Sequence, residues 1–417
     1  MKNVLAPVAA LLIGVSILFT GQGLQGTLLP VRASLESFPT VLIGIMGAAY
    51  FFGFTIGCLK GGELVKRVGH VRVFLAMASL ASATPLLHGM ILHPITWGLL
   101  RGLTGFCFAV LYIVIESWLN ERSTNEDRGI IFSTYVMISL TVLAAGQMMT
   151  LLYDPTGLEL FIIASVLVSL GAIPVALSTS PSPAQPQQVD VNLRRLFRIS
   201  PAGTAGCLAT GLANGAFWAL APVFTASVSD DTSLAAWFMT SAVIGGALSQ
   251  WPLGYVSDRI GRRKVILTAA IFGVVIATMI VTAGSNLDFL TVNLLGAGWG
   301  AVAFPLYAIS VAHANDYAEP DEYVMVSSGL LLMYGIGAII GPFVASMLMA
   351  AIGTGGLYGF TAVIHILLSL YVGHRMLRRT TTPTEHHISF SDALATAHTA
   401  SCVYEEEIHQ PVETDDD

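Results

Sequence analysis

The chain is dominated by uncharged, apolar runs that are long enough to cross a bilayer. Residues 3–31, 232–257 and 265–287 contain no Asp, Glu, Lys or Arg. A membrane-spanning helix needs about 20 mostly apolar residues, and lipid offers the backbone no hydrogen-bond partners, so each run must form its hydrogen bonds internally. Only 11% of the 417 residues are charged, against about 25% in soluble domains. The sequence therefore predicts an all-α membrane protein.

Twelve such runs predict twelve transmembrane helices. The first, at residues 3–31, is too long for the apolar core of a signal peptide and lacks a small-residue cleavage site, so we expect a retained helix. The others cover about 38–60, 72–91, 94–118, 129–153, 159–179, 200–227, 233–254, 265–284, 288–313, 323–350 and 356–375. With both termini cytoplasmic, every Lys and Arg except Arg32 and Arg101 lies on the cytoplasmic side, as the positive-inside rule requires.

An internal repeat divides the chain. The basic loop at residues 254–264 (GYVSDRIGRRK) has an earlier, weaker copy at residues 62–72 (GELVKRVGHVR). Gln22-Gly23 and Asn214-Gly215 match at the same offset. Two parallel repeats of six helices predict two pseudo-symmetric bundles, at residues 1–179 and 200–379. Residues 180–199 form a predicted cytoplasmic linker, and residues 380–417 an acidic cytoplasmic tail predicted to be disordered.

These motifs resemble those of a known family. The second loop matches the signature G-x-x-x-D-R-x-G-R-R/K of major facilitator transporters, whereas the first has Lys66 in place of the acid. Arg101-Gly-Leu-Thr-Gly105 resembles that family's R-x-x-x-G signature, and residues 116–123 and 211–224 are similar to its YcaD-like branch. The resemblance implies the major facilitator fold and secondary active transport of a small solute across the cytoplasmic (inner) membrane by alternating access.

The two basic loops are predicted to form a cytoplasmic gate. Asp258 is expected to meet the start of the fifth helix, where unpaired N–H groups attract an acid, and Arg259 and Arg262 are expected to pair with Asp316. In the first half, Lys66 and Arg67 are expected to pair with the acids at residues 319–322. These contacts exist only while the cytoplasmic side is closed. The alternative is that the loops only set topology. The predicted gating set is Asp258, Arg259, Gly261, Arg262, Gly62, Lys66, Arg67 and Gly69.

Arg101 and Glu116 are charged residues within predicted spans, where a charge is usually functional. Arg101 predicts an anionic solute, unless it snorkels to the membrane surface or forms a structural ion pair. Glu116 follows after about fifteen residues, or roughly 22 Å of helix, so the two are not partners. Glu116 is predicted to carry a coupling proton, with a brace for the cytoplasmic gate as the alternative and sodium coupling still open.

Uncharged polar and aromatic residues complete the predicted solute site. Gln22 and Asn214 occupy equivalent repeat positions, as paired sites near the two-fold axis would. A single amide also serves often as a bond between helices, and this alternative stays open. The predicted binding residues are Arg101, Gln22, Gln25, Asn214, Trp218, Tyr112, Tyr307 and Gln147, with Gln250, Asn293 and Tyr334 as weaker candidates.

Other functional classes have little support in the sequence. There is no phosphate-binding loop and no clustered metal ligands in the membrane part, so we expect no enzyme activity, no cofactor and no nucleic-acid partner. The expected partners are the lipid bilayer, a small solute and a coupling proton, and the expected state is a monomer. Two alternatives remain: an efflux pump for amphipathic compounds, and a non-transporting membrane sensor acting through its tail.

Overall fold

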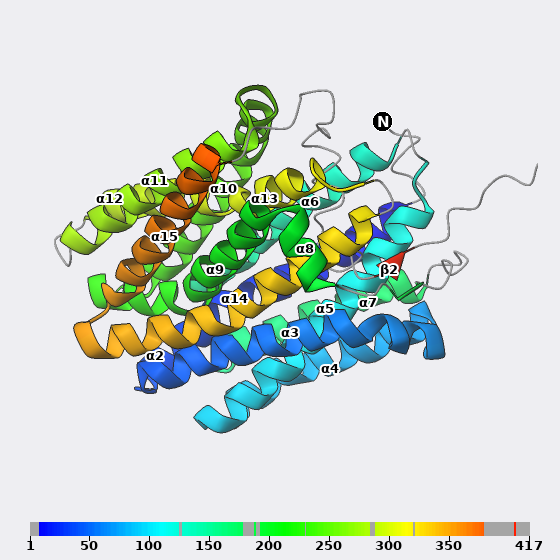
Figure 1. The fold of residues 1–417 in the computed structure, drawn as a ribbon. Helices are drawn as coiled ribbons and strands as arrows, with labels where there is room; N and C mark the ends of the chain where they lie inside the picture. Colours follow the sequence, from blue (N-terminus) through cyan, green and yellow to red (C-terminus); the bar gives the residue numbers. More distant parts are fainter. Residues whose placement is uncertain are drawn as a thin grey trace, which may run out of the picture.

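A computed structural model describes residues 8–124, 127–177, 187–188, 192–229, 231–283, 288–319, 322–378 and 404–405. Long helices dominate the described part, and Figure 1 shows them lying roughly side by side. The first half contains α2 (Ala9–Leu35), α3 (Thr40–Val68), α4 (His70–Met90), α5 (Pro94–Glu121), α6 (Arg128–Met148), the short 3-10 helix η2 (Met149–Leu151) and α7 (Glu159–Ala176). The second half contains α8 (Leu193–Ile199), α9 (Pro201–Val228), α10 (Ser233–Ile260), α11 (Arg262–Ala283), α12 (Phe289–Ala303), α13 (Pro305–Asn315), α14 (Tyr323–Ile352) and α15 (Gly356–Arg378).

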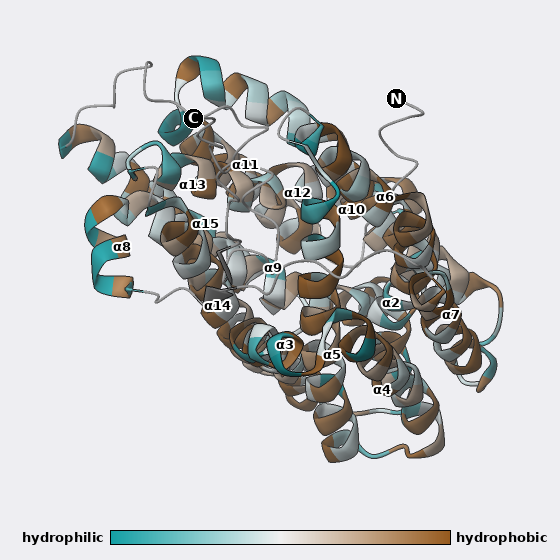
Figure 2. Ribbon diagram, turned by 90° about the vertical axis from the view of Figure 1, so that its right-hand side faces the viewer, coloured by the Kyte–Doolittle hydropathy of each residue, from teal (hydrophilic) through white to brown (hydrophobic). Residues whose placement is uncertain are grey.

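The helices confirm the predicted all-α membrane fold. Eleven stretches are long and apolar enough to cross a membrane, with α12 and α13 together making one of them. Helix α10 has 28 residues and carries no charge before Asp258, as the predicted eighth span requires, but it is not among these eleven. Hydrophobic residues predominate along the long helices, and hydrophilic ones are more frequent at several helix ends and in the connections (Figure 2).

Two local features add detail to the predictions. The tenth predicted helix is interrupted at Phe304, because Pro305 has no N–H to donate to the preceding turn and begins α13 instead. The predicted linker contains a helix, α8, whose Leu196 and Ile199 are buried against the second half. Most of the tail lies outside the described residues. Two short strands, β1 (Gln187–Gln188) and β2 (Tyr404–Glu405), pair antiparallel.

The up-and-down order of the helices gives the bundle two distinct ends. We call the end where α3 meets α4 and α10 meets α11 the basic end, and the other the opposite end. Both junctions turn on a glycine with positive φ, 93° at Gly69 and 98° at Gly261. Residues with a Cβ rarely adopt this conformation. The repeat seen in the sequence is therefore also a repeat of backbone geometry.

The two halves are packed tightly at the opposite end. A Cβ placed on Gly47 in α3 would collide with the Ala219 side chain of α9, and Gly44 similarly lies against Ser346 of α14. One hydrophobic cluster joins residues of both halves there, including Ile43 and Val223. The molecule is therefore closed between its halves at the opposite end.

Helices α6 and α10 come from different halves and contact each other near the opposite end. Near the opposite end, the Thr240 hydroxyl of α10 lies 3.4 Å from the Gln147 amide oxygen of α6. Towards the basic end, Trp251 on α10 is 72% exposed and Met137 on α6 is 59% exposed.

Candidate functional site

A cavity of about 270 Å³ lies between the two halves. Helices α2, α3, α5 and α6 line it from the first half, and α9 and α14 from the second. Its wall reaches Cys58 and Leu59 of α3 and Ser328 of α14, which lie towards the basic end. Because the halves are packed together at the opposite end, the cavity extends towards the basic end only.

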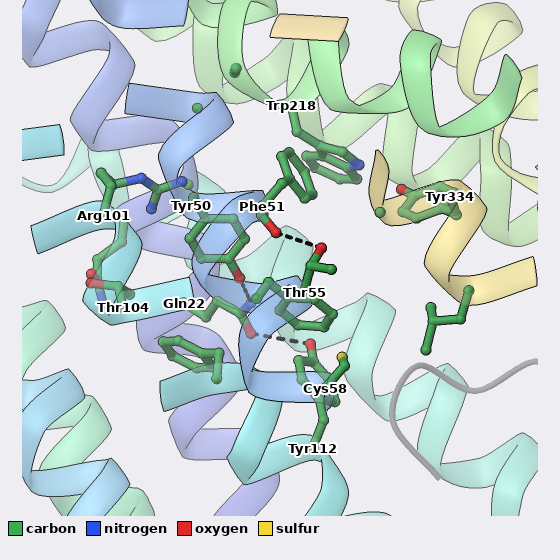
Figure 3. Close-up of a pocket in the computed structure, with 18 of the residues that line it drawn as sticks. Gln22, Tyr50, Phe51, Thr55, Cys58, Arg101, Thr104, Tyr112, Trp218 and Tyr334 are labelled. Carbon is green, nitrogen blue, oxygen red and sulfur yellow. Dashed lines mark hydrogen bonds between the residues drawn. The ribbon is translucent and has the colours of Figure 1, made fainter. Parts of the chain in front are cut away.

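A hydrogen-bonded triad crosses the first-half wall of the cavity (Figure 3). The Gln22 Nε2 of α2 donates to the Tyr50 hydroxyl of α3 over 3.0 Å. The Tyr112 hydroxyl of α5 donates to Gln22 Oε1 over 3.2 Å. One amide thereby fixes two tyrosines from two other helices, which holds the polar surface of the cavity in a defined geometry.

The cavity contains one cationic side chain among the residues that line it. The Arg101 guanidinium lies 4.3 Å from the centre of the Tyr50 ring (Figure 3), a distance suited to a cation–π contact. Among the described residues, it forms no hydrogen bond and no ion pair with a carboxylate. Its hydrogen-bonding groups are therefore available to a ligand.

The rest of the cavity wall is mostly apolar and aromatic. Trp218 of α9 faces the cavity and stacks on Phe304, with 5.3 Å between ring centres and 8° between ring planes. Figure 3 places Trp218 and Tyr334 across the cavity from Arg101 and the triad. The lining also includes Phe51, Phe54, Phe108, Leu143, Leu331 and Leu332. One side of the cavity is thus polar and cationic, and the other apolar.

An ionic cluster lies at the basic end of the second half. Arg262, which begins α11, binds Asp316 at the end of α13 over 2.9 Å and Asp258 at the end of α10 over 2.7 Å. The Arg262 and Asp316 side chains are each only 1% exposed. The Arg262 guanidinium also donates to the Ser257 hydroxyl over 3.0 Å. The cluster therefore ties together three helices of one half.

The remaining basic-loop residues have other contacts. Arg259 lies 4.2 Å from the centre of the Tyr255 ring. Lys66 and Arg67 are exposed at the end of α3. Glu322, one of the acids expected to meet them, instead binds Arg195 of α8 over 2.7 Å. The expected first-half ion pair with Glu322 is therefore not formed in this conformation.

Comparison with known proteins agrees with this architecture. The sequence profile of the Major Facilitator Superfamily matches residues 11–230 and 203–400. The chain belongs to the major facilitator superfamily.

Relatives within the superfamily cover almost the whole transporter. An uncharacterized MFS-type transporter YcaD of Escherichia fergusonii is 26% identical over 385 residues, which are 91% of this chain and 98% of the relative. A YcaD of Salmonella arizonae is 25% identical and covers 84% of this chain and 90% of its own. The resemblance to the YcaD-like branch is thereby confirmed.

Solved structures show the same fold. The nucleoside transporter NupG has a TM-score of 0.76 at 14% identity and covers 90% of this chain and 100% of its own. The fucose:proton symporter FucP of E. coli has a TM-score of 0.56 at 15% identity and covers 91% and 100%. The chain is thus a multi-pass membrane transporter of the major facilitator fold.

Glu116 of the transporter lies outside the cavity wall but next to it. Its side chain is fully buried on α5. It lies within electrostatic range of two cavity residues, Cys58 and Tyr112, and close enough to the Tyr135 hydroxyl for a hydrogen bond. A buried acid therefore lies one helical turn from Tyr112, a member of the Gln22 triad.

The structure brings most of the predicted binding residues together. Six of the eight line the cavity, and the weaker candidate Tyr334 joins them. Asn214 is buried on α9 but does not line the cavity. Tyr307 packs on the Tyr334 ring at 5.1 Å between ring centres and also lies outside the cavity wall. The residues that line it are Arg101, Gln22, Gln25, Trp218, Tyr112 and Gln147.

Sequence reasoning missed Tyr50, which contacts both Arg101 and Gln22. Tyr50 stands beside Phe51 and Phe52 in an apolar run, where a tyrosine resembles its aromatic neighbours. The equivalent repeat position holds Ala242, so the repeat gave no signal. A useful clue was that the Tyr50 hydroxyl requires a polar partner inside a span.

Proposed function

We propose that this transporter moves a small amphipathic organic anion through the central cavity by alternating access. The observation that carries the proposal is the Arg101 guanidinium, which lines the cavity without a carboxylate partner among the described residues. A cation inside a span needs compensation. A planar guanidinium binds a carboxylate through two parallel hydrogen bonds, so an anionic solute supplies what the cavity wall lacks.

The apolar part of the cavity determines the rest of the solute. Aromatic rings of Phe54 and Trp218 and the side chain of Leu331 line the space beyond the triad. Burial of apolar solute surface against such a wall contributes about 25 cal/mol of binding free energy per Å². An anion with an aromatic or aliphatic body therefore fits better than a fully hydrated one.

The distribution of positive charge supports a cytoplasmic basic end. In that orientation both termini are cytoplasmic, and the described conformation faces inward. Transport then requires separation of contacts at the opposite end, such as Thr240 with Gln147. It also requires approach of α6 and α10 at the basic end. In that closed state, Asp258 is proposed to reach the start of α6, and the basic-loop residues act as the gate.

We further propose that Glu116 carries a coupling proton. Glu116 lies one helical turn from Tyr112 on α5, and the Tyr112 hydroxyl bonds to Gln22 in the cavity wall. If Glu116 takes up a proton on one face and releases it on the other, alternation of the same cavity moves the solute and the proton together.

The solute proposal is tested by a thermal-shift screen of purified transporter against carboxylates and neutral amphipathic compounds, followed by flux of the hits into proteoliposomes. Arg101→Lys is expected to lose most flux of the anionic hit while keeping expression and melting temperature. Arg195→Lys, on the exposed helix α8, is the matched control and keeps flux. Normal flux in Arg101→Lys contradicts a bidentate role, and early melting makes the residue structural.

The coupling proposal has a separate test. Glu116→Gln is expected to abolish accumulation driven by a pH gradient while solute exchange between the two faces continues. Both are measured in proteoliposomes with and without an imposed gradient. Uphill accumulation that persists in the variant excludes Glu116 as the proton carrier.

Two alternatives give different outcomes. The aromatic lining favours a neutral amphipathic cargo as the second candidate, in which case uncharged compounds dominate the screen and Arg101→Lys leaves flux intact. A sensor acting through its tail requires residues 380–417, most of which lie outside the described residues. Deletion of this segment keeps flux in a transporter.

A further inference from the structure

The closed end of the cavity contains a hydrogen-bond acceptor without a donor. Gln25 lines the cavity, and its side chain is 2% exposed. Its Oε1 has no hydrogen-bond partner among the described residues. Leaving a buried acceptor without a donor is unfavourable, so such an atom in a binding cavity points to a group that the ligand supplies.

The orientation of the Gln25 amide follows from its other contact. One end of the amide lies 3.5 Å from the Gly21 carbonyl oxygen. That end must be the NH2 group, because two carbonyl oxygens facing each other repel. The remaining end is therefore the carbonyl oxygen, which accepts but cannot donate.

The unpaired acceptor and the cation line the same cavity. Gln25 follows Gln22 by about one helical turn on α2. Gln22 donates to the Tyr50 hydroxyl, and the Arg101 guanidinium covers the Tyr50 ring. Tyr50 and Gln22 thus connect the two groups along one wall, and a solute in the cavity can contact both.

We infer that the head group of the solute combines a carboxylate with an adjacent O–H or N–H donor, as in a 2-hydroxy or 2-acylamino acid. This inference rests on the proposed function and narrows its substrate class. The carboxylate pairs with Arg101, and the donor group bonds to Gln25 Oε1. The apolar body lies along Phe54 and Leu331 towards the basic end.

A water molecule does not remove the requirement for this donor. In the empty cavity, a water can donate to Gln25 Oε1. A solute that fills the closed end displaces this water, and affinity is lost when the solute cannot replace the hydrogen bond. A site built around a buried polar group rejects the analogue that lacks its partner.

Three matched probes test the inference on the full-length transporter in lipid nanodiscs. 3-Phenyllactate carries the carboxylate and the hydroxyl, 3-phenylpropionate only the carboxylate, and 3-phenyllactamide lacks the negative charge. Calorimetry or tryptophan fluorescence gives the three dissociation constants. We expect 3-phenyllactate to bind at least about tenfold more tightly than 3-phenylpropionate, and 3-phenyllactamide to bind least.

Gln25→Leu is expected to abolish the preference for the hydroxyl by weakening 3-phenyllactate binding and leaving 3-phenylpropionate binding within about twofold. Asn293→Leu is the matched control, since it removes a buried amide that does not line the cavity and should keep the preference. The comparison of the two acids on the unmodified protein does not depend on the folding of any variant.

Each result has a definite meaning. Equal binding of the two acids overturns the donor requirement but leaves the proposed transport of anions intact. Tightest binding of 3-phenyllactamide, or no binding by either acid, overturns both the head-group inference and the anionic solute. A hydroxyl preference that survives Gln25→Leu shows that another group accepts the bond, and it overturns the assignment to Gln25.

Discussion

The two basic loops share a backbone turn but differ in how they hold their helices together. In the second half, Arg262 binds Asp258 and Asp316 and thereby joins α10, α11 and α13. In the first half, the position equivalent to Arg262 holds His70, which is buried 6.1 Å from the Trp118 ring. Lys66 replaces the acid, and its side chain is exposed.

This difference separates two features of the repeat, the glycine turn and the ionic cluster. The glycine is kept in both loops because the backbone conformation excludes a Cβ. Among the described residues, the ionic cluster is present in the second half only, so it is not required for the turn. At this end, ion pairs join the helices of the second half, whereas apolar and aromatic packing around His70 joins the helices of the first half.

The largest expected effect on the free energy of unfolding comes from removing Arg262 from the ionic cluster. Arg262→Met leaves two acids without their buried partner, which typically costs about 3–5 kcal/mol of unfolding free energy. Denaturant titration of the protein in nanodiscs measures the loss. Arg259→Met is the control, since an exposed cation–π contact contributes only about 0.5–1 kcal/mol. Equal losses in the two variants would contradict a stabilising cluster. Adding Asp316→Leu to Arg262→Met should restore part of the stability.

A smaller effect should be the same in both halves. Gly69→Ala and Gly261→Ala each place a Cβ on a backbone with positive φ, at a cost of about 1–3 kcal/mol. The same titration measures both, and Gly359→Ala serves as a control because its surroundings in α15 are open. A loss of unfolding free energy in only one of the two variants would mean that the glycine turn stabilises only one half.

A substitution of Asp258 is expected to have the smallest effect on stability, and it distinguishes a gating role from a structural one. Asp258 is one-third exposed, so Asp258→Asn should cost no more than about 1 kcal/mol. If Asp258 closes the basic end, the variant slows flux and speeds alkylation of Cys58, the cysteine that lines the cavity. Lys66→Gln should change neither quantity. Unchanged flux and alkylation in Asp258→Asn would leave the loop with a topological role alone.

The sequence predicted what depends on local chemistry. Uncharged runs locate the spanning helices, and the repeated glycines locate the two turns. Arg262 and Asp316 were expected to meet only while the cytoplasmic side is closed. That condition is wrong, because the pair is formed within the second half in a conformation whose cavity extends towards the basic end. A lone arginine in a span correctly drew attention to Arg101, which lines the cavity.

Features that depend on packing between helices could not be predicted. The place of Tyr50 under Arg101 results from the close approach of α3 and α5, where Gly53 lies against the Gly102 backbone. Asn214 shares a repeat position with Gln22, yet only Gln22 lines the cavity, although the equivalent positions Gly26 and Trp218 both line it. A repeat fixes topology but not which side chains reach the cavity.

The break between α12 and α13 lies between the cavity wall and the ionic cluster at the basic end. Trp218 forms part of the cavity wall and stacks on Phe304, the residue at the break. Beyond it, α13 is a stiff rod of about 16 Å that ends beside Asp316, the partner of Arg262. A solute that contacts the Trp218 ring therefore touches a side chain from which one short helix leads directly to the Arg262–Asp316 ion pair.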